Sequence, residues 1–197
     1  MSKLICVIGK SSSGKDTIYK ALLNDKALNL NTVILYTTRP IREGEKNGVE
    51  YFFVDDTFLE EAKKKQKVIE SRAYQTIHGV WNYFMMDDGQ LDFEKGNYII
   101  IGTLESYQQI KQYFGEDRVL PIYVYVEDGL RLKRALERER RQQAPKYEEL
   151  CRRFLSDAKD FSEDKIVECH ISKRYNNNEL NHCLNEIKTD ILKEISV

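Results

Sequence analysis

A short apolar segment that runs into a glycine-rich loop constrains this chain more than any other feature of its sequence. Leu4 to Ile8 are apolar and include three β-branched residues, which favours a buried strand. The next residues, Gly9 to Thr17, contain the spacing G-x-x-x-x-G-K, and apolar residues at helical spacing follow from residue 18 to residue 22. Such glycines let backbone N–H groups curl around phosphates, which Lys15 would also contact. The sequence therefore predicts a strand, a phosphate-binding loop and a helix in succession.

One position of this loop differs from the usual pattern. Asp16 stands where a serine or threonine would place a hydroxyl on Mg²⁺. A carboxylate can bind Mg²⁺ directly or through water. An acidic residue is also favoured in the first turn of a helix by the helix dipole, in which case Thr17 or a water would serve the metal. Both interpretations stay open at the level of sequence.

The rest of the chain alternates strands with helices. Apolar segments predict strands at residues 33–36, 98–101 and 119–126, and segments with helical periodicity separate them. This alternation favours an α/β fold with a mostly parallel sheet and helices on both faces. Residues from about 38 to 88 break the alternation with turn signals and short apolar runs, which indicates an inserted small α+β lobe.

Composition limits the possible partners. The chain has 31 Lys and Arg against 32 Asp and Glu, so its net charge is -1 and no overall basic field would hold nucleic acid. No segment approaches the roughly 20 apolar residues of a membrane span. Four cysteines without a C-x-x-C spacing are expected to be reduced thiols. We therefore expect no nucleic acid partner, no membrane insertion and a cytoplasmic location.

Two segments beyond the loop resemble guanylate kinases. Tyr36 to Glu45 and Asn47 to Val54 are closely similar to the GMP-site segment of that family, and the resemblance runs from about Leu4 to Phe154. It implies the P-loop NTPase three-layer fold of nucleoside monophosphate kinases, with a GMP-binding lobe and an arginine-bearing lid. We expect one guanylate kinase-like domain over residues 1–197, with a core at 1–37 and 89–197, a nucleotide monophosphate-binding lobe at about 38–88 and a lid at about 138–148.

The second block has a physical interpretation of its own. Arg39 and Arg42, three residues apart and beside the Tyr51 hydroxyl, suit a dianionic phosphate. In the family, matching positions hold the GMP phosphate, and Glu70 matches a glutamate that accepts hydrogen bonds from guanine N1 and N2. The expected GMP-binding residues are Arg39, Arg42, Tyr51, Glu70, His78 and Thr103.

The chain departs from the family pattern mainly around the base. An Asp-x-Asp pair of the family is absent from Ile101 to Glu105, Leu35 replaces a base-reading serine, and Ile77 to Val80 replaces a Tyr-Tyr-Gly-Ser segment. Ribose 1,5-bisphosphate phosphokinases also have G-K-D in the loop and lack the acid pair, so a sugar-phosphate kinase is an alternative. A non-catalytic guanylate kinase-like module that binds phosphorylated partners is another.

The expected lid is rich in arginine. Lys133 to Arg138 resembles the family's K-R-L-x-x-R, and Arg152 to Phe154 resembles a later K-R-L. Arg134 and Arg138 are four residues apart and would project from one helix face toward the donor phosphates, together with Arg153. A solvated charged helix is the alternative for this stretch.

The function that we expect is that of a nucleoside monophosphate kinase, most simply a guanylate kinase that converts ATP and GMP into ADP and GDP. Its cofactor would be Mg²⁺ with ATP as phosphoryl donor, and the protein would be a monomer or homodimer. The expected catalytic residues are Lys15, Arg39, Arg42, Arg134, Arg138 and Arg153. The expected ATP-binding residues are Gly9, Lys10, Ser11, Ser12, Ser13, Gly14, Lys15, Asp16 and Thr17, with Asp16 and Thr17 as metal ligands.

Overall fold

A five-stranded parallel sheet lies at the centre of the computed structural model, which describes residues 1–76 and 79–195. The phosphate loop leaves the carboxyl end of its middle strand, where parallel α/β sheets place their ligands. Every pair of neighbouring strands is parallel. In spatial order the strands are β2 (Leu30–Thr32), β7 (Asn97–Gly102), β1 (Leu4–Ile8), β8 (Val119–Tyr125) and β9 (Arg174–Asn176).

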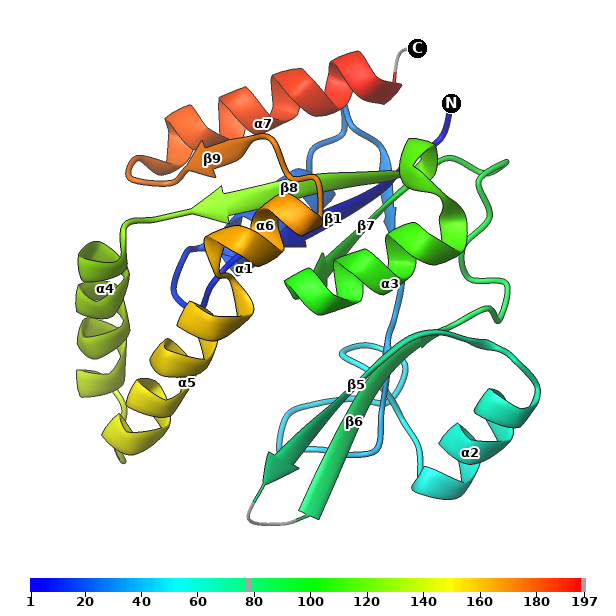
Figure 1. The fold of residues 1–197 in the computed structure, drawn as a ribbon, viewed down its shortest axis with the longest axis horizontal. Helices are drawn as coiled ribbons and strands as arrows, with labels where there is room; N and C mark the ends of the chain where they lie inside the picture. Colours follow the sequence, from blue (N-terminus) through cyan, green and yellow to red (C-terminus); the bar gives the residue numbers. More distant parts are fainter. Residues whose placement is uncertain (77–78, 196–197) are drawn as a thin grey trace.

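Helices cover both faces of this sheet. Successive side chains of β1 point to opposite faces, and all of them are buried, so each face must be covered. Leu4, Cys6 and Ile8 pack against α3 (Leu104–Phe114) and α6 (Glu163–Glu168). Ile5 and Val7 pack against α1 (Lys15–Leu23) and α7 (Leu180–Ile195). Figure 1 shows α7 on one side of the sheet and α3 on the other. The three-layer α/β fold expected from the sequence is therefore confirmed.

The second sheet belongs to a lobe that lies below the central sheet in Figure 1, on the side opposite α7. Its long antiparallel hairpin, β5 (Val68–Thr76) and β6 (Gly79–Met86), is joined to the core through α3, since the Ser71 N–H donates to Gln109 Oε1 at 3.0 Å. The lobe also contains β3 (Tyr36–Thr37), β4 (Phe52–Phe53) and α2 (Asp56–Lys64).

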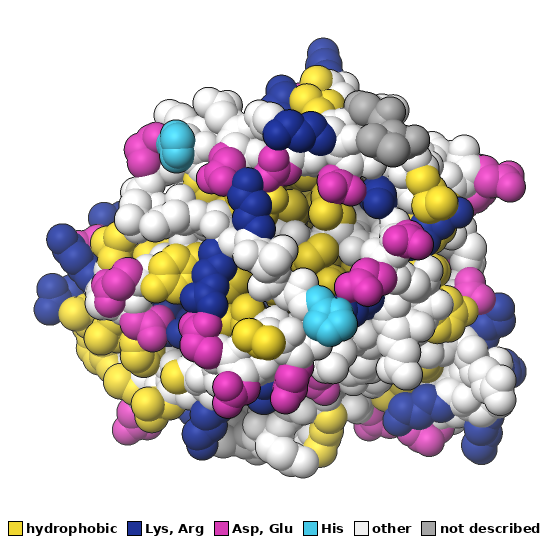
Figure 2. All heavy atoms as spheres, turned by 45° about the horizontal axis from the view of Figure 1, so that its top comes forward, with side chains coloured by type: hydrophobic (Ala, Val, Ile, Leu, Met, Phe, Trp, Pro, Cys, Tyr) yellow, Lys and Arg dark blue, Asp and Glu magenta, His cyan; other side chains and the backbone are white. Residues whose placement is uncertain are grey.

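Two helices flank the carboxyl end of the central sheet. The helix α4 (Asp128–Arg140) follows β8, and α5 (Tyr147–Asp160) lies beside it at the left of Figure 1. A single 3₁₀ turn, η1 (Glu116–Arg118), connects α3 to β8. Among the described residues, no helix has the length and apolar character needed to cross a membrane. On the face in Figure 2, acidic and basic side chains are intermixed, in keeping with the net charge of -1.

One expected strand is absent, and two short strands of the central sheet were not expected. The strands at 4–8, 98–101 and 119–126 are confirmed, but the strand at 33–36 is wrong because β2 ends at Thr32 and β3 begins at Tyr36. The backbone of Ile34 instead pairs with the Gln90 side chain, whose oxygen accepts from the Ile34 N–H at 3.0 Å. Its amide also donates to the Ile34 carbonyl at 3.1 Å. The sequence pattern also did not predict β2 or β9, each of which is only three residues long.

Candidate functional site

The glycines of the phosphate loop are required by close contacts. A Cβ atom at Gly9 would lie 2.6 Å from the Val124 carbonyl oxygen, and one at Gly14 would lie 2.4 Å from the Asn177 amide nitrogen. Gly14 also has φ +84°, in the left-handed region that favours glycine. Asn177, which follows β9, is buried and donates to the Ser13 carbonyl at 2.8 Å. The loop is therefore held from outside by a residue more than 160 positions away in the chain.

Several hydrogen-bond donors in this loop and beside it are buried without a described protein partner. Among the described residues, the hydroxyls of Ser12 and Ser13 and one terminal guanidinium nitrogen of Arg131 have no hydrogen-bonded partner. Leaving a buried polar group unpaired costs about 1–3 kcal/mol, and more when it is charged. Phosphate oxygens would satisfy such donors, so the loop has the chemistry of an anion site.

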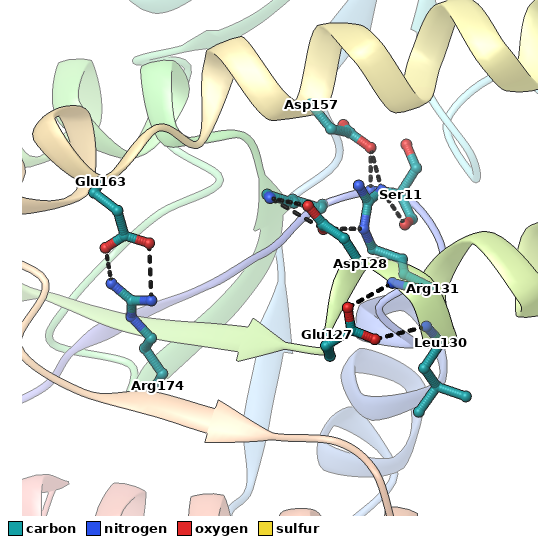
Figure 3. A network of polar contacts seen from close by, with 10 residues as sticks. Ser11, Glu127, Asp128, Leu130, Arg131, Asp157, Glu163 and Arg174 are labelled. Carbon is teal, nitrogen blue, oxygen red and sulfur yellow. Dashed lines mark hydrogen bonds and ion pairs between the residues drawn. The ribbon is translucent and has the colours of Figure 1, made fainter.

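Carboxylates from the two flanking helices order the loop, as Figure 3 shows. Asp157 of α5 accepts from the Ser11 N–H at 2.8 Å and from Arg131 Nη1 at 2.8 Å. Arg131, on α4, is 1% exposed, lies over the Phe154 ring at 4.3 Å and also donates to the Ser11 carbonyl at 2.9 Å. The helices α4 and α5 and the phosphate loop thus form one hydrogen-bonded unit.

Lys10 is held by Asp128, at 3.1 Å between the ammonium and a carboxylate oxygen. Burial acts to raise the pKa of Asp128, but the hydrogen bond and charge of Lys10, helped by Arg131, outweigh it and lower the pKa. In the part of the chain that the structure describes, the Lys15 ammonium forms an ion pair only with its neighbour Asp16, at 3.6 Å, and both line the large cleft described below. Lys15 therefore remains available to a ligand in that cleft.

A cavity of about 340 Å³, here called the lid cavity, lies between the loop and the two flanking helices. Arg138 and Arg153 line it together with Arg42 of the lobe, and Arg153 donates to the Ser11 hydroxyl at 3.2 Å. Arg134 lines neither cavity and instead donates to the Asn177 carbonyl at 3.0 Å. Two of the three expected lid arginines therefore line this cavity beside the phosphate loop, and the third supports the segment that holds the loop.

A cleft of about 1220 Å³ separates the core from the lobe. Arg42 and Tyr51 line its lobe side, and the guanidinium of Arg42 pairs with no carboxylate among residues 1–76 and 79–195. Burial raises the pKa of the Tyr51 hydroxyl, so this group stays a hydrogen-bond donor. Arg39 lies behind them: it is 4% exposed, stacks on the Tyr51 and Phe53 rings and forms two hydrogen bonds to Glu45, at 2.6 and 2.7 Å.

The expected base-reading residue is closed off from the cleft. Glu70 is 1% exposed, and its two oxygens accept from Arg72 Nε at 2.9 Å and from Arg72 Nη2 at 3.1 Å. Arg72 lines the cleft, whereas Glu70 is not among its lining residues. Thr103 also lines the cleft while it caps the N-terminus of α3. His78 lies outside the described residues.

The acidic residues near the phosphate loop suit a metal ion that is held mainly by the phosphates of a bound substrate. The described residues contain no group of three or more His, Cys, Asp or Glu side chains that would hold an ion by themselves. Mg²⁺ in phosphoryl-transfer sites is usually held by one or two carboxylates together with substrate phosphates and water. Asp16 lines the cleft beside Lys15 and suits that arrangement, whereas Thr17 is exposed and does not line the cleft.

Three residues of the site were missed by the sequence analysis. The sequence patterns singled out none of Asn177, Asp157 and Arg72. Asp157 and Asn177 act through contacts with the distant phosphate loop, so no local pattern signals them. Arg72 had a signal, because residues two apart on a strand share a face and Glu70 was already a candidate.

Comparison with known proteins gives a consistent result. The family model described as "Guanylate kinase" matches residues 1–194. Proteins named guanylate kinase from Porphyromonas gingivalis and Bacteroides thetaiotaomicron are each 32% identical, over 126 and 182 residues. These alignments span 63% and 87% of this chain, and 65% and 72% of the relatives, so the first covers just under two thirds of that relative. The crystal structure of guanylate kinase from Anaplasma phagocytophilum has the same fold, with a TM-score of 0.62 at 21% identity over 98% of this chain and 87% of that one.

Proposed function

The chain belongs to the guanylate kinase family, whose reaction is the ATP-dependent phosphorylation of GMP, and we propose that its own cleft performs this transfer. The observation that carries the proposal is that Lys15 of the phosphate loop and Arg42 and Tyr51 of the lobe line one continuous cleft. A triphosphate on the loop and a monophosphate on the lobe would meet there. Phosphoryl transfer needs mainly this alignment and compensation of negative charge.

On the donor side, the loop binds the ATP phosphates through its backbone N–H groups and its buried hydroxyls. Lys15 neutralises the phosphate charge, and Arg131 offers a buried nitrogen that no protein group satisfies. Arg138 and Arg153, which line the lid cavity, approach the transferred group from the lid side. Charge spread over the moving phosphoryl oxygens is stabilised by such preorganised cations.

On the acceptor side, Arg42 and the Tyr51 hydroxyl donate to the phosphate of GMP. Arg39 supports them from behind, because its guanidinium stacks on the Tyr51 ring and its pairing with Glu45 fixes the loop that carries Arg42. The Arg42 N–H itself donates to Glu45 at 2.8 Å. The acceptor oxygen is already anionic, so the reaction requires no general base.

The family's dependence on nucleotide leads us to propose Mg²⁺ as cofactor, with Asp16 as the residue of this chain that would hold it. The ion would supply charge neutralisation and alignment of the donor phosphates. Lys15 and Asp16 are adjacent in sequence and both line the cleft, so one short segment would bind phosphate and metal together.

The test is an assay of ADP release by the purified protein with MgATP and one acceptor at a time, namely GMP, AMP, CMP, UMP or ribose 1,5-bisphosphate. Turnover with GMP supports the proposal. Turnover only with ribose 1,5-bisphosphate would identify a sugar-phosphate kinase, and no transfer to any acceptor would indicate a module that only binds phosphorylated ligands. Either result would overturn the proposal.

A further inference from the structure

The most unusual feature of the acceptor side is a buried ion pair on β5. Glu70 and Arg72 are two residues apart on this strand, so their side chains lie on the same face. Two hydrogen bonds join them, from Arg72 Nε at 2.9 Å and from Arg72 Nη2 at 3.1 Å. Glu70 is 1% exposed and Arg72 9% exposed. A pair held in this way has little freedom to move.

The two partners differ in their access to the cleft. Both carboxylate oxygens of Glu70 are occupied by Arg72, and Glu70 does not line the cleft. Arg72 does line it. The group that this part of the lobe presents to a ligand is therefore a guanidinium, with the carboxylate behind it as its support.

Tyrosine rings surround Arg72 on the lobe side of the cleft. Tyr51, Tyr74 and Tyr83 all line the cleft, and Tyr83 packs edge-on against the other two with ring centroids 5.6 Å apart in each case. Burial raises the pKa of the Tyr74 hydroxyl, against the opposing charge of Arg72. Leu35 and Ile101 also line the cleft. Flat rings and apolar side chains around one charged group are typical of a site for a planar base.

The chemistry of a guanidinium decides which base suits it. Arginine has five N–H donors and no acceptor, and the pair with Glu70 uses Nε and one Nη2 donor. Arg72 also has a side-chain hydrogen bond with the Tyr74 hydroxyl, so a base would bind to the remaining N–H donors beside this tyrosine. A 6-oxopurine offers two adjacent acceptors, O6 and N7, and a bidentate contact from arginine is the commonest protein recognition of that edge in guanine. Adenine places an amino donor at the same position, opposite which a guanidinium has no partner.

We propose that Arg72, held in place by Glu70, selects the acceptor base by donating to O6 and N7 of a 6-oxopurine. The proposal rests on the proposed function, since it names the base that the same cleft accepts. The N1 and N2 groups of guanine take no part in this contact. Hypoxanthine has O6 and N7 and lacks the 2-amino group, so it is accepted about as readily as guanine, whereas adenine is rejected.

The experiment compares GMP, IMP and AMP in two ways: as acceptors, through kcat/KM with MgATP, and as ligands without ATP, through calorimetric Kd values. A bidentate base contact discriminates by about 1–3 kcal/mol, which corresponds to about 5- to 150-fold. We expect GMP and IMP to agree within about fivefold and AMP to be at least about tenfold poorer in both measurements.

The decisive variant is Glu70→Gln/Arg72→Gln, which removes both charges and so leaves no unpaired buried ion. The glutamine amide can donate to O6 or accept from the adenine amino group, so the GMP-to-AMP ratio should fall toward about 1. Arg72→Lys keeps the charge but lacks the planar fork, and its ratio should lie between the two. The matched control is Arg174→Gln, which removes an arginine paired with Glu163 outside both cavities and should leave the ratio unchanged.

The outcomes separate this inference from the proposed function. A GMP preference over IMP of about 20-fold or more, retained in the double variant, would show that the 2-amino group is read by another residue and would overturn the role of Arg72. Binding that discriminates through Arg72 without any phosphoryl transfer would refute the proposed function and support the base selection. Absence of both binding and transfer would refute both.

Discussion

The phosphate loop and the lobe differ in where their polar groups find partners. At the donor end, Lys10 pairs with Asp128 and the Ser11 N–H with Asp157, partners 118 and 146 residues away in the chain. At the acceptor end, Arg39 pairs with Glu45 and Arg72 with Glu70, only 6 and 2 residues away. The donor site is thus completed by the approach of distant helices, whereas the acceptor lobe orders its own arginines.

This difference has a mechanical consequence. Changes in α4 or α5 reach the phosphate loop directly through Arg131 and Asp157. Changes in the Arg39 and Glu45 pair act within the loop that carries Arg42. Variants at the donor end should therefore alter ATP binding, and variants at the acceptor end should alter GMP binding, with little effect on the other substrate.

The largest effect is expected for Lys15→Ala. Removing the cation that neutralises the donor phosphates should lower kcat with GMP by about 100-fold or more, as for other preorganised charge-stabilising groups. The melting temperature should stay close to that of the unmodified chain, because within residues 1–76 and 79–195 the Lys15 ammonium has an ion pair only with the exposed Asp16 beside it. Steady-state kinetics and calorimetry measure both. The control for the loss of a lysine is Lys188→Ala, which breaks an ion pair with Asp25 in the turn after α1. Turnover by Lys15→Ala at the rate of the unmodified chain would contradict the role assigned to Lys15.

Arg42→Ala should weaken the binding of GMP without weakening the binding of ATP. Hydrogen bonds to charged groups contribute about 1.5–3 kcal/mol, so KM for GMP should rise about 10- to 100-fold. KM for ATP should change little if Arg42 serves the acceptor phosphate. Initial rates over a matrix of both concentrations measure the two constants. An equal rise in both would place Arg42 on the donor side, since it also lines the lid cavity.

Asp157→Asn tests whether the Asp157 carboxylate competes with the ATP phosphates for the hydrogen-bond donors of the phosphate loop. Asp157 accepts from the Ser11 N–H and from Arg131 Nη1, next to the unpaired Nη2 that would bind an ATP oxygen. A neutral amide oxygen binds these donors less strongly, so Kd for ATP should fall by about 3- to 10-fold while KM for GMP stays unchanged. Calorimetric titration with ATP gives the value. Weaker ATP binding would instead show that the ordering of the loop by Asp157 outweighs any competition with phosphate.

The smallest effect concerns pH and the pair of Glu45 with Arg39. The Arg39 guanidinium, through its hydrogen bonds, lowers the pKa of Glu45 to about 2. Because the folded-state pKa lies below the unfolded value, this pair stabilises the fold above about pH 4.5 and its contribution is lost as the pH falls toward 2. Glu45→Gln should melt at a lower temperature than the unmodified chain at pH 7, and the difference should shrink on acidification. A constant difference over thermal scans between pH 7 and 3 would contradict this.

Much of the fold follows from local sequence patterns. The strand Leu4–Ile8 and the helix after the loop are confirmed, because their apolar patterns are local. The glycines of the loop are visible in the sequence too, but the contacts that require them come from Val124 and Asn177, which are distant in the chain. The strand expected at 33–36 was wrong because the backbone there is satisfied by a side chain, Gln90, from 56 residues away. Short segments take the conformation that their distant partners allow.

For the site, the sequence by itself determined the residue types: a phosphate loop with Lys15, a pair of arginines near Tyr51, and a glutamate on β5. Only the tertiary structure decided which of them face a ligand. It closed Glu70 behind Arg72, turned Arg39 onto Glu45, and brought Asp157 and Asn177 to the loop. The physical reason is that a buried charged side chain needs a partner. Tertiary packing determines which partner is near enough, and the spacing of residues in the sequence does not specify that packing.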